Sequence, residues 1–179
     1  MPPARASSAT HLNAGAFRFG EVLGRGTFGV VYKVVSRRDN TEAVIKQINL
    51  GRLSRNERDE ASNEVALLSS LGHPHIIRYD GNYVDGKGLN IVMEFAARGD
   101  LHGKLKACVA RGVRLGEEQV WKYSLQLMSA LEYIHARKIL HRDIKAMNVM
   151  LDQRGDVKVR QPARSPARTA AAIPQHCSG

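Results

Sequence analysis

Residues 141–148 place three side chains suited to phosphoryl transfer within one short polar segment. The segment reads His-Arg-Asp-Ile-Lys-Ala-Met-Asn, so that Asp143, Lys145 and Asn148 occupy positions i, i+2 and i+5. A carboxylate can accept the proton of an attacking hydroxyl, an ammonium group can neutralise a phosphate, and an amide oxygen can ligate magnesium. We therefore interpret this segment as a catalytic loop.

A glycine-rich motif earlier in the chain is a second candidate phosphate site, because Gly24, Gly26 and Gly29 have the spacing G-x-G-x-x-G. In a dinucleotide-binding fold such a motif opens a helix, whereas the residues at 30–35, Val-Val-Tyr-Lys-Val-Val, favour a strand. The motif thus predicts a β-hairpin whose backbone amides approach phosphate oxygens closely. A glycine-rich hairpin without a ligand is the alternative.

A lysine within an apolar strand is the third feature. Lys46 ends the sequence Ala-Val-Ile-Lys, and Glu64 lies on the apolar side of a predicted helix, next to Val65. A lysine among apolar residues needs an anionic partner to stay charged, so Glu64 could hold Lys46 towards a phosphate. Alternatively, Lys46 extends to solvent at the strand end and Glu64 is an exposed helical residue.

The first half of the chain predicts the elements that would position the glycines and the lysine. Apolar, β-branched runs predict five strands, at 17–23, 30–35, 41–50, 76–84 and 89–95. The last two are joined through Asp-Gly-Lys-Gly at 85–88, which has hairpin chemistry. A helix starting at the capping box of Ser54 and Glu57 and ending at Gly72 separates them from the first three. This order is typical of an antiparallel sheet with one helix.

The second half predicts a long helix, a polar loop and a short hairpin. Apolar residues recur at helical spacing over 117–137, and the runs 149–151 and 157–159 flank a turn-forming segment. The polar loop that carries Asp143 lies between the helix and the hairpin. Catalytic groups are commonly displayed on such a loop.

The composition limits the class of protein. The 179 residues carry 27 lysines and arginines against 17 aspartates and glutamates, a net charge of +10, without a cluster of five or six basic residues. Nucleic-acid binding is therefore not expected. No segment has the length of a membrane span or the apolar core of a signal peptide, so we expect no membrane partner.

The cysteines and the two ends of the chain complete this picture. Cys108 and Cys177 stand in unlike contexts and suggest neither a disulfide nor a zinc site, which favours a cytoplasmic protein, with cytoskeletal or nuclear association left open. Residues 1–16 are rich in Ala, Ser and Pro, and residues 160–179 in Ala, Pro and Arg. We expect both ends to be disordered and residues 17–159 to fold.

Together, the three motifs over residues 17–159 resemble the signature set of eukaryotic-type protein kinases. Lys145 in HRDIKAMN resembles the serine/threonine type rather than the tyrosine type, and Val44-Ile-Lys46 with HRDIKAMNVML resembles the NIMA-related family. The resemblance implies an α+β fold. Its N-lobe, a five-stranded antiparallel sheet with one helix, would be complete at 17–95, and residues 96–159 would form only the first part of a helical C-lobe.

The resemblance also implies ATP and Mg²⁺ as cofactors and protein serine or threonine hydroxyls as phosphoryl acceptors. Asp143 would deprotonate the hydroxyl, Lys145 would stabilise the transferring phosphoryl group, and Asn148 would hold a magnesium ion. The nucleotide would contact three glycines over its phosphates, a lysine–glutamate pair, apolar residues around the adenine, and the gatekeeper and hinge. These residues are Gly24, Gly26, Gly29, Lys46, Glu64, Val31, Val44, Met150, Met93, Glu94, Phe95 and Ala96.

The resemblance stops near residue 159, where the kinase family continues with Asp-Phe-Gly and, later, Ala-Pro-Glu; neither triplet occurs in this sequence. Two hypotheses follow. In the first, the sequence is that of a serine/threonine kinase truncated or read out of frame near residue 159, with impaired activity. In the second, it is a noncatalytic half-kinase that binds a nucleotide or a partner as a scaffold.

Overall fold

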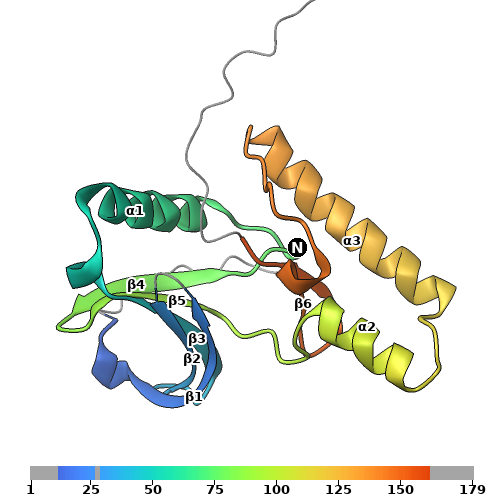
Figure 1. The fold of residues 1–179 in the computed structure, drawn as a ribbon, viewed down its shortest axis with the longest axis horizontal. Coiled ribbons are helices and arrows are strands. Elements are labelled where there is room, and N and C mark those ends of the chain that lie inside the picture. Colours follow the sequence, from blue (N-terminus) through green and yellow to red (C-terminus); the bar gives the residue numbers. More distant parts are fainter. Residues whose placement is uncertain (1–11, 27–28, 162–179) are drawn as a thin grey trace, which may run out of the picture. The chain divides into compact units, whose positions relative to one another are not determined.

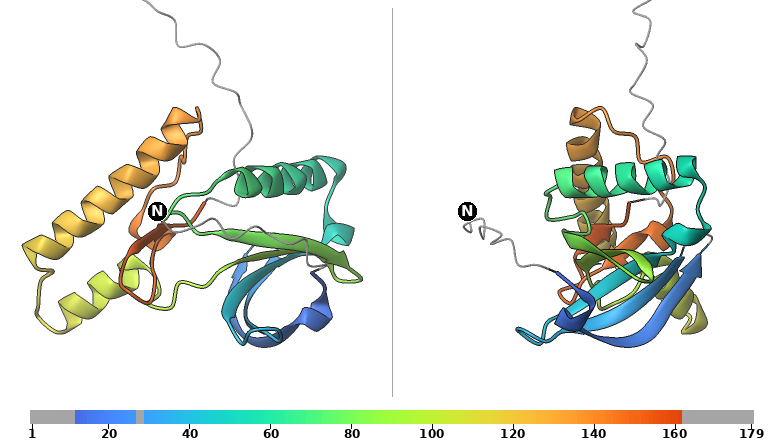
Figure 2. Two further views of the ribbon diagram at one scale, coloured as in Figure 1. Left: turned by 180° about the vertical axis from the view of Figure 1, so that it is seen from behind. Right: turned by 90° about the vertical axis from the view of Figure 1, so that its left-hand side faces the viewer.

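The computed structural model describes residues 12–26 and 29–161, and these form two compact units. The first unit comprises the residues up to Arg52 together with Asp80–Met93. The second comprises Leu53–Tyr79 together with the residues from Glu94 onward. Figures 1 and 2 show the elements of each unit. They include the predicted five-stranded sheet, the helix that lies between the third and fourth strands in the sequence, the long helix and the hairpin that follows it.

The first unit contains a five-stranded sheet with the strand order β1-β2-β3-β5-β4. Its strands are β1 (Phe17–Gly26), β2 (Gly29–Ser36), β3 (Glu42–Ile48), β4 (Tyr79–Asp85) and β5 (Gly88–Glu94). The pairs β1–β2 and β2–β3 are antiparallel, as predicted. The turn between β4 and β5 contains only residues 86 and 87, in agreement with the Asp-Gly-Lys-Gly signal.

Strand register assigns the side chains of β2 and β3 to two faces. On one face, Val34 and Ile45 are fully buried and pack with Ala43 and with residues of three other strands, Phe17, Tyr83 and Val92. On the opposite face lie Val31 and Lys46, which are register partners, and Val44, which pairs with Lys33. The apolar core therefore holds the sheet from one side and leaves Val31, Val44 and Lys46 together on the other.

The chain before β1 differs from the expectation of disorder up to residue 16. Ala14–Ala16 form a 3-10 helix that is capped by Asn13, whose side-chain oxygen accepts a hydrogen bond from the backbone of Ala16 at 3.2 Å. Leu12 and Ala16 pack against the core of the first unit. These two apolar residues explain why the ordered region begins earlier; residues 1–11 and 162–179, also predicted to be disordered, lie outside the described residues.

Helix α1 (Arg55–Ser70) begins at the predicted capping box. The Ser54 hydroxyl accepts from the backbone of Glu57, and the Glu57 carboxylate accepts from the backbone of Ser54 at 2.9 Å. The helix belongs to the second unit rather than to the unit of the sheet. Leu71 lies in the core of the second unit with Leu67 packed against it, and the backbone of Gly72 donates to the Tyr133 hydroxyl at 2.9 Å.

The rest of the second unit consists of α2 (Leu101–Ala110), α3 (Glu117–Ala136) and the hairpin of β6 (Val149–Leu151) and β7 (Val157–Val159). One face of α3 supplies Tyr123, Ala130 and Ile134 to the core, which also includes the valines and Leu151 of the hairpin. Trp121, Leu125 and Met128, on other positions of α3, are more than 60% exposed. Within the described residues, no helix is long and apolar enough to span a membrane.

Backbone hydrogen bonds fix the hairpin on both of its edges. On the β7 side, Ile77 donates to Val159 at 3.0 Å and Val159 donates to His75 at 2.8 Å. On the β6 side, Arg98 donates to Leu151 at 3.0 Å and Leu151 donates to Gly99 at 2.8 Å. The predicted strand at 76–84 therefore begins only at residue 79, because residues 75–77 pair with β7 instead.

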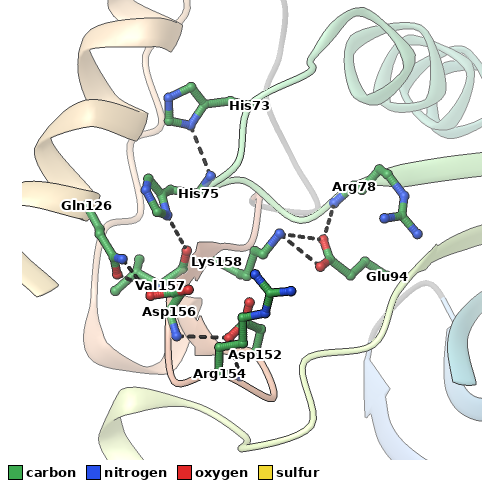
Figure 3. A network of polar contacts seen from close by, with 10 residues as sticks. All are labelled: His73, His75, Arg78, Glu94, Gln126, Asp152, Arg154, Asp156, Val157 and Lys158. Atoms are coloured by element: carbon green, nitrogen blue, oxygen red, sulfur yellow. Dashed lines mark hydrogen bonds and ion pairs between the residues drawn. The ribbon is translucent and has the colours of Figure 1, made fainter. Parts of the chain in front are cut away.

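Side chains reinforce this hairpin, as Figure 3 shows. The amide of Gln126 in α3 donates to Asp156 at 2.7 Å and accepts from the backbone of Val157 at 2.8 Å. His75 contacts the carbonyl of Val157 at 3.1 Å, and the backbone of His75 donates to Nδ1 of His73 at 3.1 Å. The hairpin is thus tied to α3 and to the segment that follows α1.

We expect Gly29→Ala to destabilise the first unit. A Cβ atom at residue 29 would lie 1.9 Å from the carbonyl oxygen of Gln47, so β2 and β3 would have to separate. The expected cost is about 1–3 kcal/mol, typical of an overpacked site, measured by urea unfolding followed by circular dichroism. Gly24→Ala is the matched control, because a Cβ there meets nothing within 4 Å; equal losses for the two variants would contradict this account.

We also expect stability to fall as the pH is lowered below about 6.5. Burial, together with the positive charges of His75, Arg137 and Lys158, lowers the pKa of His73 from its usual 6.5. The unfolded chain then binds more protons than the folded chain in this range, so acid favours unfolding. His73→Asn keeps an acceptor for the backbone of His75 but cannot titrate, and should flatten the fall in melting temperature between pH 7.5 and 5.5. His102→Gln, at an exposed site in α2, should leave it unchanged.

Candidate active site

The loop between α3 and β6 is shaped by its histidine. His141 is buried, and its Nδ1 accepts a hydrogen bond from the backbone of Asp143 at 3.3 Å. This short-range bond accompanies a left-handed conformation at Arg142, with φ of 63°, which turns the chain sharply before Asp143. Because Nδ1 accepts, the other ring nitrogen donates, and Nε2 lies 2.9 Å from the carbonyl oxygen of Arg160.

The structure brings together the three residues predicted to perform phosphoryl transfer. The Lys145 ammonium lies 2.9 Å from Oδ1 of Asp143, and the Asn148 amide nitrogen donates to Oδ2 and to the backbone carbonyl of Asp143, both at 2.8 Å. Asn148 is buried at the end of a 3-10 helix (Ala146–Asn148), whereas the side chains of Asp143 and Lys145 are about half exposed. The Asp143 carboxylate is therefore held by the buried amide of Asn148 and by Lys145, and about half of the side chain remains accessible to solvent.

Hydrogen bonds from Lys145 and Asn148 lower the pKa of the Asp143 carboxyl from its usual 3.8. The carboxylate is accordingly ionised at neutral pH and can act as a hydrogen-bond acceptor for an incoming hydroxyl. Its two oxygens already have fixed partners, which orients the group before a substrate arrives. The arrangement fits a base that positions a hydroxyl next to an ammonium group.

Arg160 completes this network, although the sequence placed it at the start of the disordered tail. Its backbone N–H donates to the carbonyl of Asn148 at 2.8 Å, and its guanidinium donates to the side-chain oxygen Oδ1 of Asn148 at 2.8 Å. That oxygen is the atom to which the kinase resemblance assigns magnesium. The contact disagrees with this expected role, because the oxygen already accepts from a cation.

The predicted hinge residues Glu94 and Ala96 also belong to the second unit. Glu94 contacts Lys158 of β7 through both carboxylate oxygens, at 2.9 and 3.1 Å, and accepts from the backbone of Arg78 at 3.1 Å (Figure 3). Ala96 is buried, and its carbonyl accepts from Gly99. Met150, expected below the adenine, is the register partner of Lys158, so the two side chains share a face of the hairpin.

Apart from Glu64, the remaining predicted nucleotide contacts lie in the first unit. Gly24 and Gly26 are in the last part of β1, paired with Val31 and Gly29 respectively, so the three glycines lie at the adjoining ends of two antiparallel strands. Gly24 and Gly26 have open space where a side chain would begin, which leaves their backbone accessible to a ligand. Gly29 differs, because the backbone of β3 fills that space.

Five of the predicted nucleotide contacts stay predictions. Val31, Val44 and Lys46 share the face opposite the core, each partly exposed, and Met93 ends the first unit in β5. Glu64, the expected partner of Lys46, lies in α1 of the second unit. The pairing between Lys46 and Glu64 and their contact with phosphates are therefore not tested by the geometry within either unit.

Sequence reasoning missed two residues, Lys158 and Arg160. Lys158 lies between two buried valines, so strand alternation predicts that its side chain points to the opposite face. Its partner Glu94 is distant in the sequence, and no local signal indicated their ion pair. Arg160 follows β7 directly, so its proximity to the loop could be expected only once β6 and β7 were known to pair. Composition alone assigned Arg160 to the wrong segment.

The sequence is similar to those of known protein kinases. Residues 17–160 match the family described as Protein kinase domain. The chain is 43% identical over 145 residues to Serine/threonine-protein kinase Nek4 of Mus musculus and 39% identical over 137 residues to Serine/threonine-protein kinase Nek1 of Mus musculus. It is 40% identical over 143 residues to Mitogen-activated protein kinase kinase kinase 1a of Physcomitrium patens.

These alignments cover 80, 76 and 78% of this chain but only 18, 11 and 18% of the respective relatives. The chain thus corresponds to a small part of each relative. Since the family match extends from the first strand to Arg160, the chain belongs to the protein kinase family, and within it the chain is similar to NIMA-related serine/threonine kinases.

Proposed function

We propose that the chain binds ATP and transfers its γ-phosphate to serine or threonine hydroxyls of proteins. The observation that carries this proposal is the loop at 141–148, in which Asp143 is ionised, about half exposed and oriented next to Lys145. The family match supports both ATP as the phosphoryl donor and a protein as the acceptor.

The loop residues divide the chemistry between them. Asp143 accepts a hydrogen bond from the substrate hydroxyl and takes its proton as the oxygen attacks phosphorus. Lys145, 2.9 Å from the same carboxylate, faces the anionic phosphoryl group with a positive charge. Asn148 acts on Asp143 through two hydrogen bonds that fix the position of the loop and of the carboxylate. Lys46, on the face of the sheet opposite its apolar core, would hold the phosphates of the nucleotide.

A second candidate function is a noncatalytic nucleotide-binding domain. It is favoured by the contact between the Arg160 guanidinium and Oδ1 of Asn148, which occupies an atom that the kinase resemblance assigns to the metal. Phosphoryl transfer and nucleotide binding are measured separately below, so that the two functions can be distinguished. Protein substrates, partners and a cytoplasmic location stay proposals drawn from the family and from composition.

Lys46→Ala should remove most of the stabilisation that ATP provides. Loss of a charge-assisted hydrogen bond to phosphate costs about 1.5–3 kcal/mol, which corresponds to roughly 10- to 100-fold weaker binding. Differential scanning fluorimetry measures the melting temperature across a range of ATP concentrations, and the variant should need higher ATP concentrations for the same rise in melting temperature. Lys87→Ala, in the turn between β4 and β5, is the control for loss of one positive charge; an unchanged titration for Lys46→Ala would mean that the lysine does not face the nucleotide.

Asp143→Asn should abolish phosphoryl transfer while ATP binding is retained. Removal of a general base costs about 10²- to 10⁴-fold in rate. The assay measures transfer of labelled phosphate to peptides that contain serine and threonine, with tyrosine peptides in parallel. Asp59→Asn, at an exposed position of α1, serves as the control. Wild-type protein that binds ATP but transfers nothing would favour the noncatalytic candidate.

A further inference from the structure

The side-chain amide of Asn148 is engaged on both of its polar atoms. Its nitrogen donates to the carbonyl and to Oδ2 of Asp143, both at 2.8 Å, and its oxygen accepts from the Arg160 guanidinium at 2.8 Å. The residue is only 2% exposed. This pattern fixes the orientation of the amide, because only the nitrogen can donate to the two Asp143 oxygens.

Arg160 is held in place by its backbone as well as by its side chain. Its N–H donates to the carbonyl of Asn148 at 2.8 Å, and its carbonyl accepts from Nε2 of His141 at 2.9 Å. The guanidinium contact is therefore the third hydrogen bond between Arg160 and the loop at 141–148. Since β6 begins immediately after Asn148 and β7 ends immediately before Arg160, the pairing of the two strands brings these residues to one end of the hairpin.

The charges around this amide disfavour a divalent cation. Lys145 and Arg160 carry two positive charges against the single negative charge of Asp143, and both oxygens of that carboxylate already have donors. Magnesium needs oxygen ligands at about 2.0–2.1 Å in near-octahedral geometry. An ion at Oδ1 of Asn148 would share this oxygen with a guanidinium, and the two cations would repel each other at close range.

We infer that Arg160 takes the place of the divalent ion at Asn148, so that this chain binds its nucleoside polyphosphate without a metal ion on that residue. The inference rests on the proposed binding of ATP and specifies its form. A guanidinium is a permanent cation with several donors, and it suits a site that receives phosphate oxygens. Binding should then be insensitive to removal of magnesium.

The test compares ATP titrations of the full chain by differential scanning fluorimetry in excess Mg²⁺ and in EDTA. The affinities of the wild type for ATP in EDTA and in Mg²⁺ should agree within about twofold. Arg160→Met removes the guanidinium but keeps the backbone hydrogen bonds and much of the side-chain length, so it frees the Asn148 oxygen. This variant should bind ATP about tenfold more tightly in Mg²⁺ than in EDTA. Arg154→Met, an exposed arginine in the turn of the same hairpin, should behave like the wild type.

A second readout follows the Asn148 side chain directly. In ¹⁵N-labelled protein with ATP, addition of Mg²⁺ should shift the side-chain amide signal of Asn148 much more in Arg160→Met than in the wild type. Wild-type binding that is lost in EDTA, or a Mg²⁺-dependent shift as large in the wild type as in Arg160→Met, overturns this inference alone. No ATP-dependent shift under any condition overturns the proposed nucleotide binding and the inference with it. If Arg160→Met does not fold, Arg160→Gln, which retains a donor without the charge, is used in the same two measurements.

Discussion

Backbone pairing on both edges of the β6–β7 hairpin is the constraint on which the second unit depends. Two strands of three residues each have little stability alone. Here residues 75–77 extend the pairing beyond β7 and residues 98–100 extend it beyond β6, so the short hairpin becomes the centre of a four-segment array. Its buried valines and Leu151 then form the core with α3. The same array determines where the chain leaves the loop at 141–148.

The chemistry of the loop follows from this position. Asn148 precedes the hairpin and Arg160 follows it, so an amide and a guanidinium meet at the end where Asp143 is held. One carboxylate then interacts directly with an ammonium group and an amide, and through the amide with a second cation. Such a network favours the ionised carboxylate and a fixed rotamer. It also makes the electrostatic character of the site depend on a residue outside the loop.

Much of this architecture could be predicted from local sequence, because the relevant signals are short-range. The capping box of Ser54 and Glu57, the turn at residues 86 and 87 and the strands 149–151 and 157–159 all depend on neighbouring residues, and each was predicted correctly. Within the candidate site, the grouping of Asp143, Lys145 and Asn148 was predictable for the same reason. The assignment of α1 to the second unit and the contacts of Lys158 and Arg160 depend on pairings between distant segments, which composition and periodicity do not encode.

Two glycines pack tightly against the end of β3. Gly29 of β2 and Gly88 of β5 lie on either side of β3, and a Cβ on either would collide with the carbonyl oxygen of Gln47 or Ile48. Close strand packing thus requires the third glycine of the G-x-G-x-x-G motif whether or not a nucleotide binds. If nucleotide binding were lost during evolution, substitutions of Gly24 and Gly26 would be tolerated, whereas Gly29 would still be required by the packing of β2 against β3. The diagnostic information for nucleotide binding in this motif therefore resides in Gly24 and Gly26.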